Sequence, residues 1–230
     1  MTERLGIIGF PVGHSISQIF QQAALDYYHL DISYVSWEVN RRSLRGFINK
    51  LRSTSDMVLG CNVTVPHKEA VIRWLDEISP EAMRVGAVNT IINNNGYLRG
   101  HNTDIYGFCK SLENHYSFSP VDKSVLVIGS GGAGRSVAFA LADLGVRSIT
   151  LANRTLARAE RLAIELKGLV SQVNGMSLIS TDIKRVASGM DMIVNCTTLG
   201  MSGSCQETMP ILQASDIPKH ALVYDLVYNP

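Results

Sequence analysis

Short apolar runs alternate with stretches of helical spacing along most of this chain. Strands are predicted at residues 5–9, 33–39, 58–65, 125–128, 148–152, 169–173, 191–196 and 222–226. Helical patterns of apolar residues predict helices at residues 18–28, 44–51, 66–74, 105–113, 133–144 and 155–166, and the helix at 44–51 shows the full i, i+3, i+4 and i+7 spacing. Strands that alternate with short helices indicate an α/β fold with mostly parallel sheets.

Local signals refine three of these elements. The apolar runs at residues 87–92 and 97–100 flank a segment that ends in Asn95-Gly96, which favours an antiparallel hairpin. Ser43 stands where a side chain can cap the helix at residues 44–51. Pro66 stands at the first position of the next predicted helix, where no backbone N–H is needed.

The sequence VLVIGSGGAGR at residues 125–135 is the strongest local motif. Its glycines Gly129, Gly131 and Gly134 follow an apolar run and open a helical pattern. In dinucleotide-binding proteins such glycines allow a tight turn, a close approach of the phosphates, and close packing of helix on strand. The helix start adds unpaired N–H groups and the positive end of its dipole. The motif therefore favours dinucleotide binding over a purely structural glycine turn.

The residues after the next strand favour NADP over NAD. NAD-binding units of this kind carry an acidic residue about 20 positions beyond the glycines. Here the segment reads Asn153-Arg154-Thr155, with Arg158 one helical turn later and no acidic residue. A guanidinium binds a phosphate through two parallel hydrogen bonds, and Thr155 offers a hydroxyl. The alternative is that Thr155 only caps its helix and Arg158 is a solvated surface charge.

These elements divide the chain near residue 104. A polar run at residues 114–120 separates the helix at 105–113 from the strand that precedes the glycine motif. We expect an N-terminal α/β substrate domain over residues 1–104, with a mostly parallel sheet. A C-terminal doubly wound, Rossmann-type NADP-binding domain then covers residues 105–230, with a cleft between the two domains.

Composition excludes several other classes of protein. With 230 residues, 46% hydrophobic and 18% charged, the chain is typical of a soluble globular protein. A net charge of +1 and scattered basic residues argue against nucleic-acid and membrane partners. No apolar run approaches the roughly 18 residues of a membrane span. The four cysteines form no CxxC pair, so we expect reduced thiols in a cytoplasmic enzyme. The six histidines are dispersed, which argues against a metal site.

Small polar residues gather at the strand ends of the first domain. Ser15 and Ser17 lie in the first loop, Asn62 and Thr64 share one face of the third strand, and Asn89 lies on a later strand. Hydroxyls and amides that converge from several strand ends suit a small ligand with hydroxyl or carboxylate groups. Helix capping for the serines and hydrogen bonds at strand edges for the others are the alternative interpretations.

Lys68 and Asp104 are the candidates for proton transfer. Lys68 falls in the first turn of the helix predicted from Pro66, where a cation opposes the helix dipole. Asp104 ends the first domain, and it could alternatively be the N-cap of the helix that begins at Ile105. If the two side chains meet in the cleft, they form a proton-handling pair beside the nicotinamide.

Seven segments of the chain resemble those of the shikimate dehydrogenase family. They are GFPVGHSIS at 9–17, NVTVPHK at 62–68, AVNT at 87–90, HNTD at 101–104, GSGGAGR at 129–135, NRT at 153–155 and DLVYNP at 225–230. The resemblance implies NADPH-dependent, reversible reduction of 3-dehydroshikimate to shikimate, in chorismate and aromatic amino acid biosynthesis. It also implies that Lys68, oriented by Asp104, donates the proton while NADPH delivers hydride to the carbonyl carbon.

The resemblance assigns the remaining roles residue by residue. Lys68 and Asp104 correspond to the catalytic pair. The expected substrate-binding residues are Ser15, Ser17, Asn62, Thr64, Lys68, Asn89, Asp104 and Tyr228. The expected cofactor-binding residues are Gly129, Ser130, Gly131, Gly132, Ala133, Gly134, Asn153, Arg154, Thr155, Arg158, Thr197 and Leu226.

The chain departs from the family pattern in two places. Gln18, Gln21 and Gln22 occupy the region where the family continues with proline and then histidine. The sequence also ends at Pro230, whereas family members continue into a helix that packs on the first domain and carries a substrate-contacting glutamine. Without that segment we expect apolar surface to be exposed on the first domain and one substrate contact to be missing. Either the sequence is a truncated form of a longer chain, or the protein is a variant with a compromised site.

Two alternative functions remain at this point. One is an NAD-linked quinate/shikimate dehydrogenase, against which Arg154 and the missing acidic residue argue. The other is a non-catalytic relative that binds nucleotide and shikimate-like metabolites, against which Lys68 and Asp104 argue. In each case the expected partner is a small molecule, and the expected state is a monomer or a homodimer.

Overall fold

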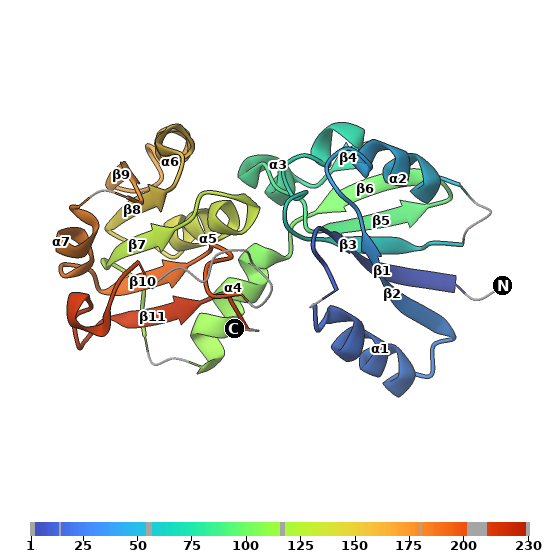
Figure 1. The fold of residues 1–230 in the computed structure, drawn as a ribbon, viewed down its shortest axis with the longest axis horizontal. Coiled ribbons are helices and arrows are strands. Elements are labelled where there is room, and N and C mark those ends of the chain that lie inside the picture. Colours follow the sequence, from blue (N-terminus) through green and yellow to red (C-terminus); the bar gives the residue numbers. More distant parts are fainter. Residues whose placement is uncertain are drawn as a thin grey trace. The chain divides into compact units, whose positions relative to one another are not determined.

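The computed structural model describes residues 3–13, 15–53, 57–115, 118–179, 181–201 and 211–228. Cys205, residues 116–117 of the polar run and residues 229–230 lie outside this part of the chain. The chain forms two compact units, divided in sequence between Thr103 and Asp104. Each unit is built on one sheet with helices packed against it (Figure 1), so the predicted α/β class is confirmed.

The first unit contains a six-stranded sheet with the order β2-β1-β3-β5-β6-β4. Only β5 runs antiparallel to its two neighbours, and the other pairs are parallel, as predicted. The strands are β1 (Glu3–Gly9), β2 (Ile32–Glu38), β3 (Gly60–Val63), β4 (Glu77–Ile78), β5 (Thr90–Asn94) and β6 (Tyr97–His101). The helices are α1 (Ser17–Tyr27), α2 (Leu44–Leu51), the 3-10 helix η2 (Ile72–Trp74) and α3 (Pro80–Val85).

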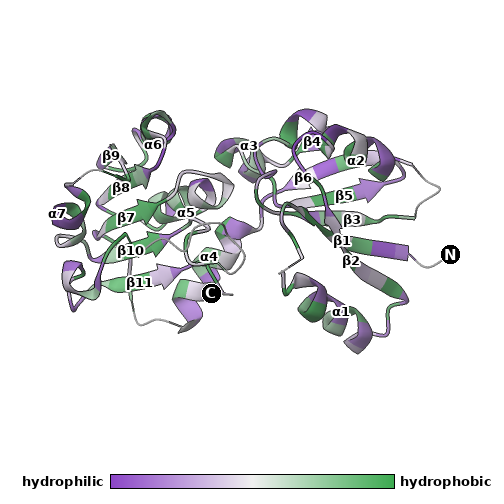
Figure 2. Cartoon of the chain, viewed as in Figure 1, coloured by the Kyte–Doolittle hydropathy of each residue, from purple (hydrophilic) through white to green (hydrophobic). Residues whose placement is uncertain are grey.

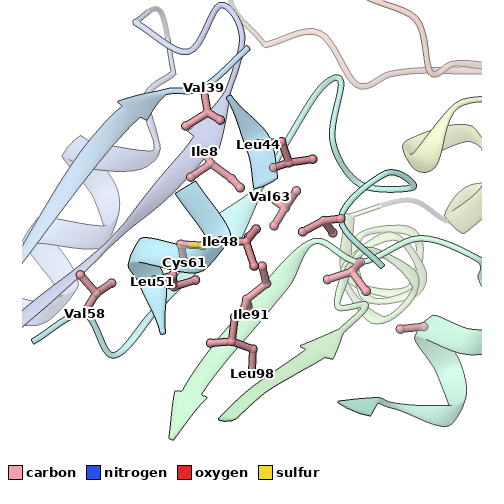
Figure 3. Close-up of a cluster of buried hydrophobic side chains, with 13 residues drawn as sticks. Ile8, Val39, Leu44, Ile48, Leu51, Val58, Cys61, Val63, Ile91 and Leu98 are labelled. Carbon is pink, nitrogen blue, oxygen red and sulfur yellow. The ribbon is translucent and has the colours of Figure 1, made fainter. Parts of the chain in front are cut away.

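Successive residues of β1 point to opposite faces of this sheet and there meet different helices. Ile8 packs in a cluster with Leu44 and Ile48 of α2, together with side chains from β3, β5 and β6 (Figure 3). Ile7 packs instead with Leu25 of α1 and with Tyr34 of β2. The two helices therefore cover opposite faces of the sheet, which buries both sides of its central strands.

The hairpin is formed as the Asn-Gly signal predicts. Asn94 pairs with Tyr97, which leaves a loop of Asn95 and Gly96. Both loop residues have positive φ, 51° and 92°, which is the conformation of a type I′ turn. The side chain of Asn93 also accepts the N–H of Gly96 at 2.8 Å.

The α-helix predicted from Pro66 is absent, and the prediction was wrong. The Val65–Pro66 peptide is cis, and the N–H of His67 donates to the carbonyl of Thr64 at 2.9 Å, which closes a turn. The carbonyl of Lys68 accepts the N–H of Val88 at 2.8 Å, which is a hydrogen bond to a distant segment and not a bond within a helix. Lys68 therefore does not lie in the first turn of an α-helix, and the helix-dipole argument does not apply to it.

Two helix starts also differ from expectation. Ser43 precedes α2 but its side chain makes no cap. Instead, Oδ1 of Asn40 accepts the N–H groups of Arg42 and Ser43 at 2.9 and 3.0 Å. The unpredicted helix α3 begins after Ser79, whose hydroxyl accepts the N–H of Ala82 at 3.3 Å.

The second unit is a five-stranded parallel sheet with the order β11-β10-β7-β8-β9. A central β7 with successive strands on one side and later strands on the other is the Rossmann arrangement, as predicted. The strands are β7 (Ser124–Ile128), β8 (Ser148–Asn153), β9 (Gln172–Ser177), β10 (Met192–Asn195) and β11 (Leu222–Asp225). The helices are α4 (Asp104–His115), α5 (Gly132–Asp143), α6 (Leu156–Leu166), α7 (Ile183–Ala187) and the 3-10 helix η3 (Ala214–Asp216).

The central strands β7 and β10 of this sheet are mostly apolar, as Figure 2 shows. All five residues of β7 are buried. The edge strand β9 is more polar, and it begins later than the predicted strand at residues 169–173 because Gly168 and Leu169 lie in a turn. No helix in the described ranges is long and apolar enough to cross a membrane.

Cys61 makes the stability of the first unit sensitive to alkaline pH. Burial raises the pKa of its thiol from 9.0 to about 12, so the folded protein keeps the thiol neutral where an unfolded chain would ionise it. This contribution to stability is fully present below about pH 9 and is lost as the pH rises toward 12. We expect the free energy of urea unfolding to fall across this range by up to about 1.4 kcal/mol per pH unit through this group. Cys61→Ala should remove that part of the slope, and an unchanged slope in Cys61→Ala would contradict the assignment.

Candidate active site

The polar residues predicted to bind substrate gather at one edge of the sheet in the first unit. The carboxyl ends of the parallel strands β1 and β3 share this edge. Because β5 runs the opposite way, its amino end lies there, and so does the carboxyl end of β6. The residues at this edge are Ser15 and Ser17 after β1, Asn62 and Thr64 at the end of β3, Lys68 beyond it, and Asn89 before β5.

The loop after β1 lies directly against the turn after β3. A Cβ on Gly9 would lie 2.4 Å from Cγ2 of Thr64 and 3.0 Å from the carbonyl oxygen of Val65, so only glycine fits at this position. The N–H of Phe10 donates to the same Val65 carbonyl at 2.9 Å. The two segments that carry the serines and Thr64 are thus fixed to each other by backbone contacts.

The buried side chain of His67 helps to fix the backbone of the adjacent Lys68 at this edge of the sheet. The imidazole of His67 is fully buried, and its Nε2 lies 2.5 Å from the carbonyl oxygen of Val39, which follows β2. The carbonyl of Lys68 accepts the N–H of Val88, the residue directly before Asn89. Lys68 itself is half-buried. Its backbone is therefore fixed beside the amino end of β5 without any help from a helix.

A chain of side-chain hydrogen bonds links the polar residues of this edge. It joins Tyr34 on β2, Asn62 on β3, Thr90 and Asn89 at the start of β5, and Thr103 after β6. We refer to these five residues as the polar chain. Sequence reasoning identified Asn62 and Asn89 but missed the others, because a buried tyrosine in a strand has the pattern of an ordinary core residue.

Asp104 follows Thr103 and is the first residue of α4. A carboxylate in the first turn of a helix is stabilised by the helix dipole. Asp104 thus lies inside the helix and not at the N-cap position that the sequence suggested. Asn89 accepts the N–H of the preceding Thr103 at 2.9 Å.

In the second unit, the glycines of the motif meet three different steric requirements. Gly129 has φ of +104°, which other residues rarely adopt. A Cβ on Gly134 would lie 2.0 Å from the carbonyl oxygen of Gly129, so α5 can pack on the turn only with glycine there. A Cβ on Gly131 would meet nothing within 4 Å. The open position beside Gly131, at the amino end of α5, is where a phosphate could approach the backbone.

The polar groups of the turn fit a nucleotide pyrophosphate. Ser130 is 2% exposed, and its hydroxyl has no hydrogen-bond partner among the described residues. Buried hydroxyls normally have a partner, so this orphaned group fits a ligand that supplies one. The N–H of Ser130 donates to Oδ1 of Asn153 at 3.0 Å, which ties the turn to the end of β8.

The residues expected to select NADP lie beside this turn. Arg158 donates to the carbonyl of Ser130 at 3.3 Å, which places its guanidinium next to the glycines. Arg154 is exposed and makes no hydrogen bond or ion pair with another described residue. Thr155 precedes α6 without a side-chain cap, so the alternative role suggested for it is not observed. Both guanidinium groups and the Thr155 hydroxyl thus follow β8, in the position that contacts the adenosine ribose in this type of fold.

The carboxyl ends of β10 and β11 complete this edge. Oδ1 of Asn195 accepts the N–H and the hydroxyl of Thr197 at 3.1 and 2.7 Å, and Nδ2 of Asn195 donates to Asp225 at 2.9 Å. The N–H of Leu226 donates to the carbonyl of Asn195 at 3.0 Å. Thr197 and Leu226 are therefore held by Asn195, which sequence reasoning missed although it lies in a predicted buried strand.

The glycine turn follows β7 at the point where the strand order reverses, between β10 and β8. Ligands of open α/β sheets bind outside the carboxyl ends of the strands at such a point. Tyr228, predicted to contact substrate, follows β11 in this unit and is 54% exposed. Within the described ranges, no group of His, Cys, Asp or Glu side chains could hold a metal ion.

Both halves of the chain match known protein families. Residues 7–91 match the shikimate dehydrogenase substrate binding domain, and residues 113–225 match shikimate / quinate 5-dehydrogenase. A shikimate dehydrogenase (NADP(+)) of Bacillus cereus (strain 03BB102) is 36% identical over 230 residues, which is all of this chain and 80% of the relative. The chain belongs to the shikimate dehydrogenase family.

Solved structures of family members have the same fold. Shikimate dehydrogenase of Aquifex aeolicus superposes with a TM-score of 0.85 at 36% identity, over 99% of this chain and 79% of that one. Shikimate 5-dehydrogenase of Thermus thermophilus, solved with NADP(H) and shikimate, gives 0.80 at 36% identity, over 99% of this chain and 80% of that one. The family predicted from the seven sequence segments is therefore confirmed.

Proposed function

We propose that this chain catalyses the reversible, NADP-dependent reduction of 3-dehydroshikimate to shikimate, a step of chorismate and aromatic amino acid biosynthesis. One observation carries the proposal. The polar edge of the first unit, with Lys68 and the polar chain from Tyr34 to Asn89 and Thr90, lies within residues 7–91, which match the family's substrate binding domain. The second unit, with its dinucleotide-binding turn, supplies the site for a hydride carrier.

The edge of the first unit suits a ring that carries hydroxyls and a carboxylate. Ser15, Ser17 and Thr64 offer hydroxyls, and Asn62 and Asn89 offer amides that can both donate and accept. Ser15 already donates to Ser17 at 2.9 Å, so the two hydroxyls lie together and can bind one carboxylate. Tyr228 is proposed to reach the same substrate from the segment after β11.

Lys68 is proposed to handle the proton, with Asp104 as the carboxylate that orients it. NADPH, when bound, supplies the hydride that reduces the ring carbonyl. The ammonium of Lys68 then donates a proton to the developing alkoxide oxygen, and in the reverse direction its amine accepts that proton. The bond from Val88 to the Lys68 carbonyl fixes the backbone from which this side chain extends.

The second unit is proposed to hold the cofactor through the turn at residues 129–134, with Asn153, Thr197 and Leu226 beside it. The N–H groups at the start of α5 and the orphaned hydroxyl of Ser130 would contact the pyrophosphate. Arg154, Thr155 and Arg158 would contact the 2′-phosphate that distinguishes NADP from NAD.

Loss of the Arg154 guanidinium should weaken NADP alone. We expect Arg154→Ala to raise the KM for NADP about tenfold, which is the effect of one lost hydrogen bond to a charged group. The KM for NAD should stay unchanged because NAD has no 2′-phosphate. Arg161→Ala, on the exposed side of the adjoining α6, is the matched control and should change neither KM. Equal effects on NADP and NAD would remove Arg154 from this role.

Turnover with four substrate pairs tests the function. We expect reduction of NADP by shikimate, followed at the nicotinamide absorbance band, to be faster than any reaction with quinate or with NAD. Preference for quinate with NAD would support the NAD-linked alternative. Binding of NADP without turnover would support the non-catalytic alternative.

A further inference from the structure

The polar chain runs in one direction across the first unit. The hydroxyl of Tyr34 donates to Oδ1 of Asn62 at 2.7 Å, and Nδ2 of Asn62 donates to Oγ1 of Thr90 at 3.3 Å. Oγ1 of Thr90 donates to Oδ1 of Asn89 at 3.0 Å, and that oxygen also accepts the N–H of Thr103 at 2.9 Å. Each member is thus joined to the next by a hydrogen bond.

This direction is fixed by the backbone of Thr103. A backbone N–H can only donate, so the amide atom of Asn89 that faces it must be the oxygen. The Thr90 hydroxyl must therefore donate its hydrogen to the oxygen of Asn89. This leaves the Thr90 oxygen to accept a hydrogen bond from the amide nitrogen of Asn62. The oxygen of Asn62 therefore faces Tyr34, whose hydroxyl has to donate.

Tyr34, at one end of the polar chain, has a buried ring and a hydroxyl that stays protonated. It is 4% exposed and packs among Ile7, Val12 and Leu25, on the face of the sheet that α1 covers. Burial, together with the neighbouring Cys61, raises the pKa of its hydroxyl, so the group stays a donor throughout the neutral and alkaline range. Apolar packing fixes the ring, and the ring fixes the position of the hydroxyl.

We propose that Tyr34 is a positioning residue for substrate binding, which acts through the amide of Asn62. The inference rests on the proposed function, in which Asn62 and Asn89 form part of the substrate-binding wall. Thr103, Asn89 and Thr90 set which atom of the Asn62 amide faces Tyr34, and the Tyr34 hydroxyl then holds the amide by its oxygen. Without that hydroxyl, Oδ1 loses this donor and the amide is held through its 3.3 Å bond to Thr90, so it is fixed less firmly in the substrate-binding wall.

Tyr34→Phe tests this proposal because it removes only the hydroxyl. We expect the KM for shikimate to rise about 2- to 10-fold, the effect of one lost neutral hydrogen bond. The kcat and the KM for NADP should change less than the KM for shikimate. Tyr224→Phe is the matched control: it removes a hydroxyl that donates to Ser111 at 3.0 Å in the second unit, and it should leave the KM for shikimate unchanged.

A double-mutant cycle separates positioning from a general loosening of the core. In an Asn62→Ala background, Tyr34→Phe should have no further effect on the KM for shikimate, because the amide through which it acts is gone. A loosened core would instead raise the KM by the same factor in both backgrounds. Thr90→Val, which interrupts the polar chain at its next link, should raise the KM in the wild-type background as Tyr34→Phe does.

The outcomes distinguish this inference from the function on which it rests. An unchanged KM for shikimate in Tyr34→Phe or in Thr90→Val overturns the inference, and so does an equal effect in the Asn62→Ala background. In these cases the proposed function stands. A wild-type protein that does not turn over shikimate overturns both.

Discussion

Lys68→Ala should lower kcat by about 10²–10⁴-fold, which is the usual contribution of a positioned general acid or base. The KM for shikimate should change much less, because the lost ammonium acts mainly on the alkoxide that develops in the transition state. The fold should persist, since the turn that carries Lys68 is held by backbone bonds and by the buried imidazole of His67. Steady-state kinetics with shikimate and NADP measure both constants.

Lys50→Ala is the matched control for this variant. Lys50 is an exposed lysine in the last turn of α2 and belongs to neither proposed binding surface. Its loss should leave kcat and both KM values at the wild-type level. A Lys68→Ala enzyme with kcat close to wild type would remove Lys68 from the proton-transfer role.

Gly134→Ala should disable cofactor binding and destabilise the second unit together. The new Cβ would lie 2.0 Å from the carbonyl oxygen of Gly129, so the turn and α5 must move apart by more than 1 Å to reach the 3.4 Å of an ordinary contact. Overpacking of this kind costs about 1–3 kcal/mol of stability. A displacement of about 1 Å in groups that position a reactant can cost roughly 100-fold in rate, so kcat/KM for NADP should fall by about that factor.

Gly131→Ala provides the contrast on the same turn. Its Cβ would meet no protein atom within 4 Å, and φ at Gly131 is −87°, which any residue can adopt. Stability should fall by less than about 1 kcal/mol, because alanine is only a poorer helix cap than glycine. The KM for NADP should nevertheless rise, since the methyl group occupies the space open to the pyrophosphate. Thermal unfolding and kinetics of the pair measure both effects, and a Gly131→Ala enzyme that binds NADP normally would contradict the placement of the pyrophosphate.

The most reliable predictions from the sequence concern features that residues close together in the chain determine. The Asn95-Gly96 hairpin follows from the φ preferences of its own two residues. The role of Gly134 follows from a contact with Gly129, five positions earlier in the same turn. The Rossmann strand order likewise follows from regular alternation of strands and helices.

Predictions failed where distant segments decide the local structure. Pro66 has the pattern of a helix start, but the carbonyl of Lys68 is taken by Val88, 20 residues later, and the helix does not form. Ser43 has the pattern of a cap, but Asn40 caps the segment instead. Tyr34 could not be recognised, since its hydrogen bond to Asn62 spans 28 residues and its burial resembles that of any core tyrosine.

The central claim is that this chain oxidises shikimate with NADP. The most direct test incubates the 230-residue protein with shikimate and NADP, follows the nicotinamide absorbance, and identifies the product. The account predicts stoichiometric formation of NADPH and 3-dehydroshikimate, with much slower reaction when NAD replaces NADP. No formation of 3-dehydroshikimate by folded protein that binds NADP would contradict it.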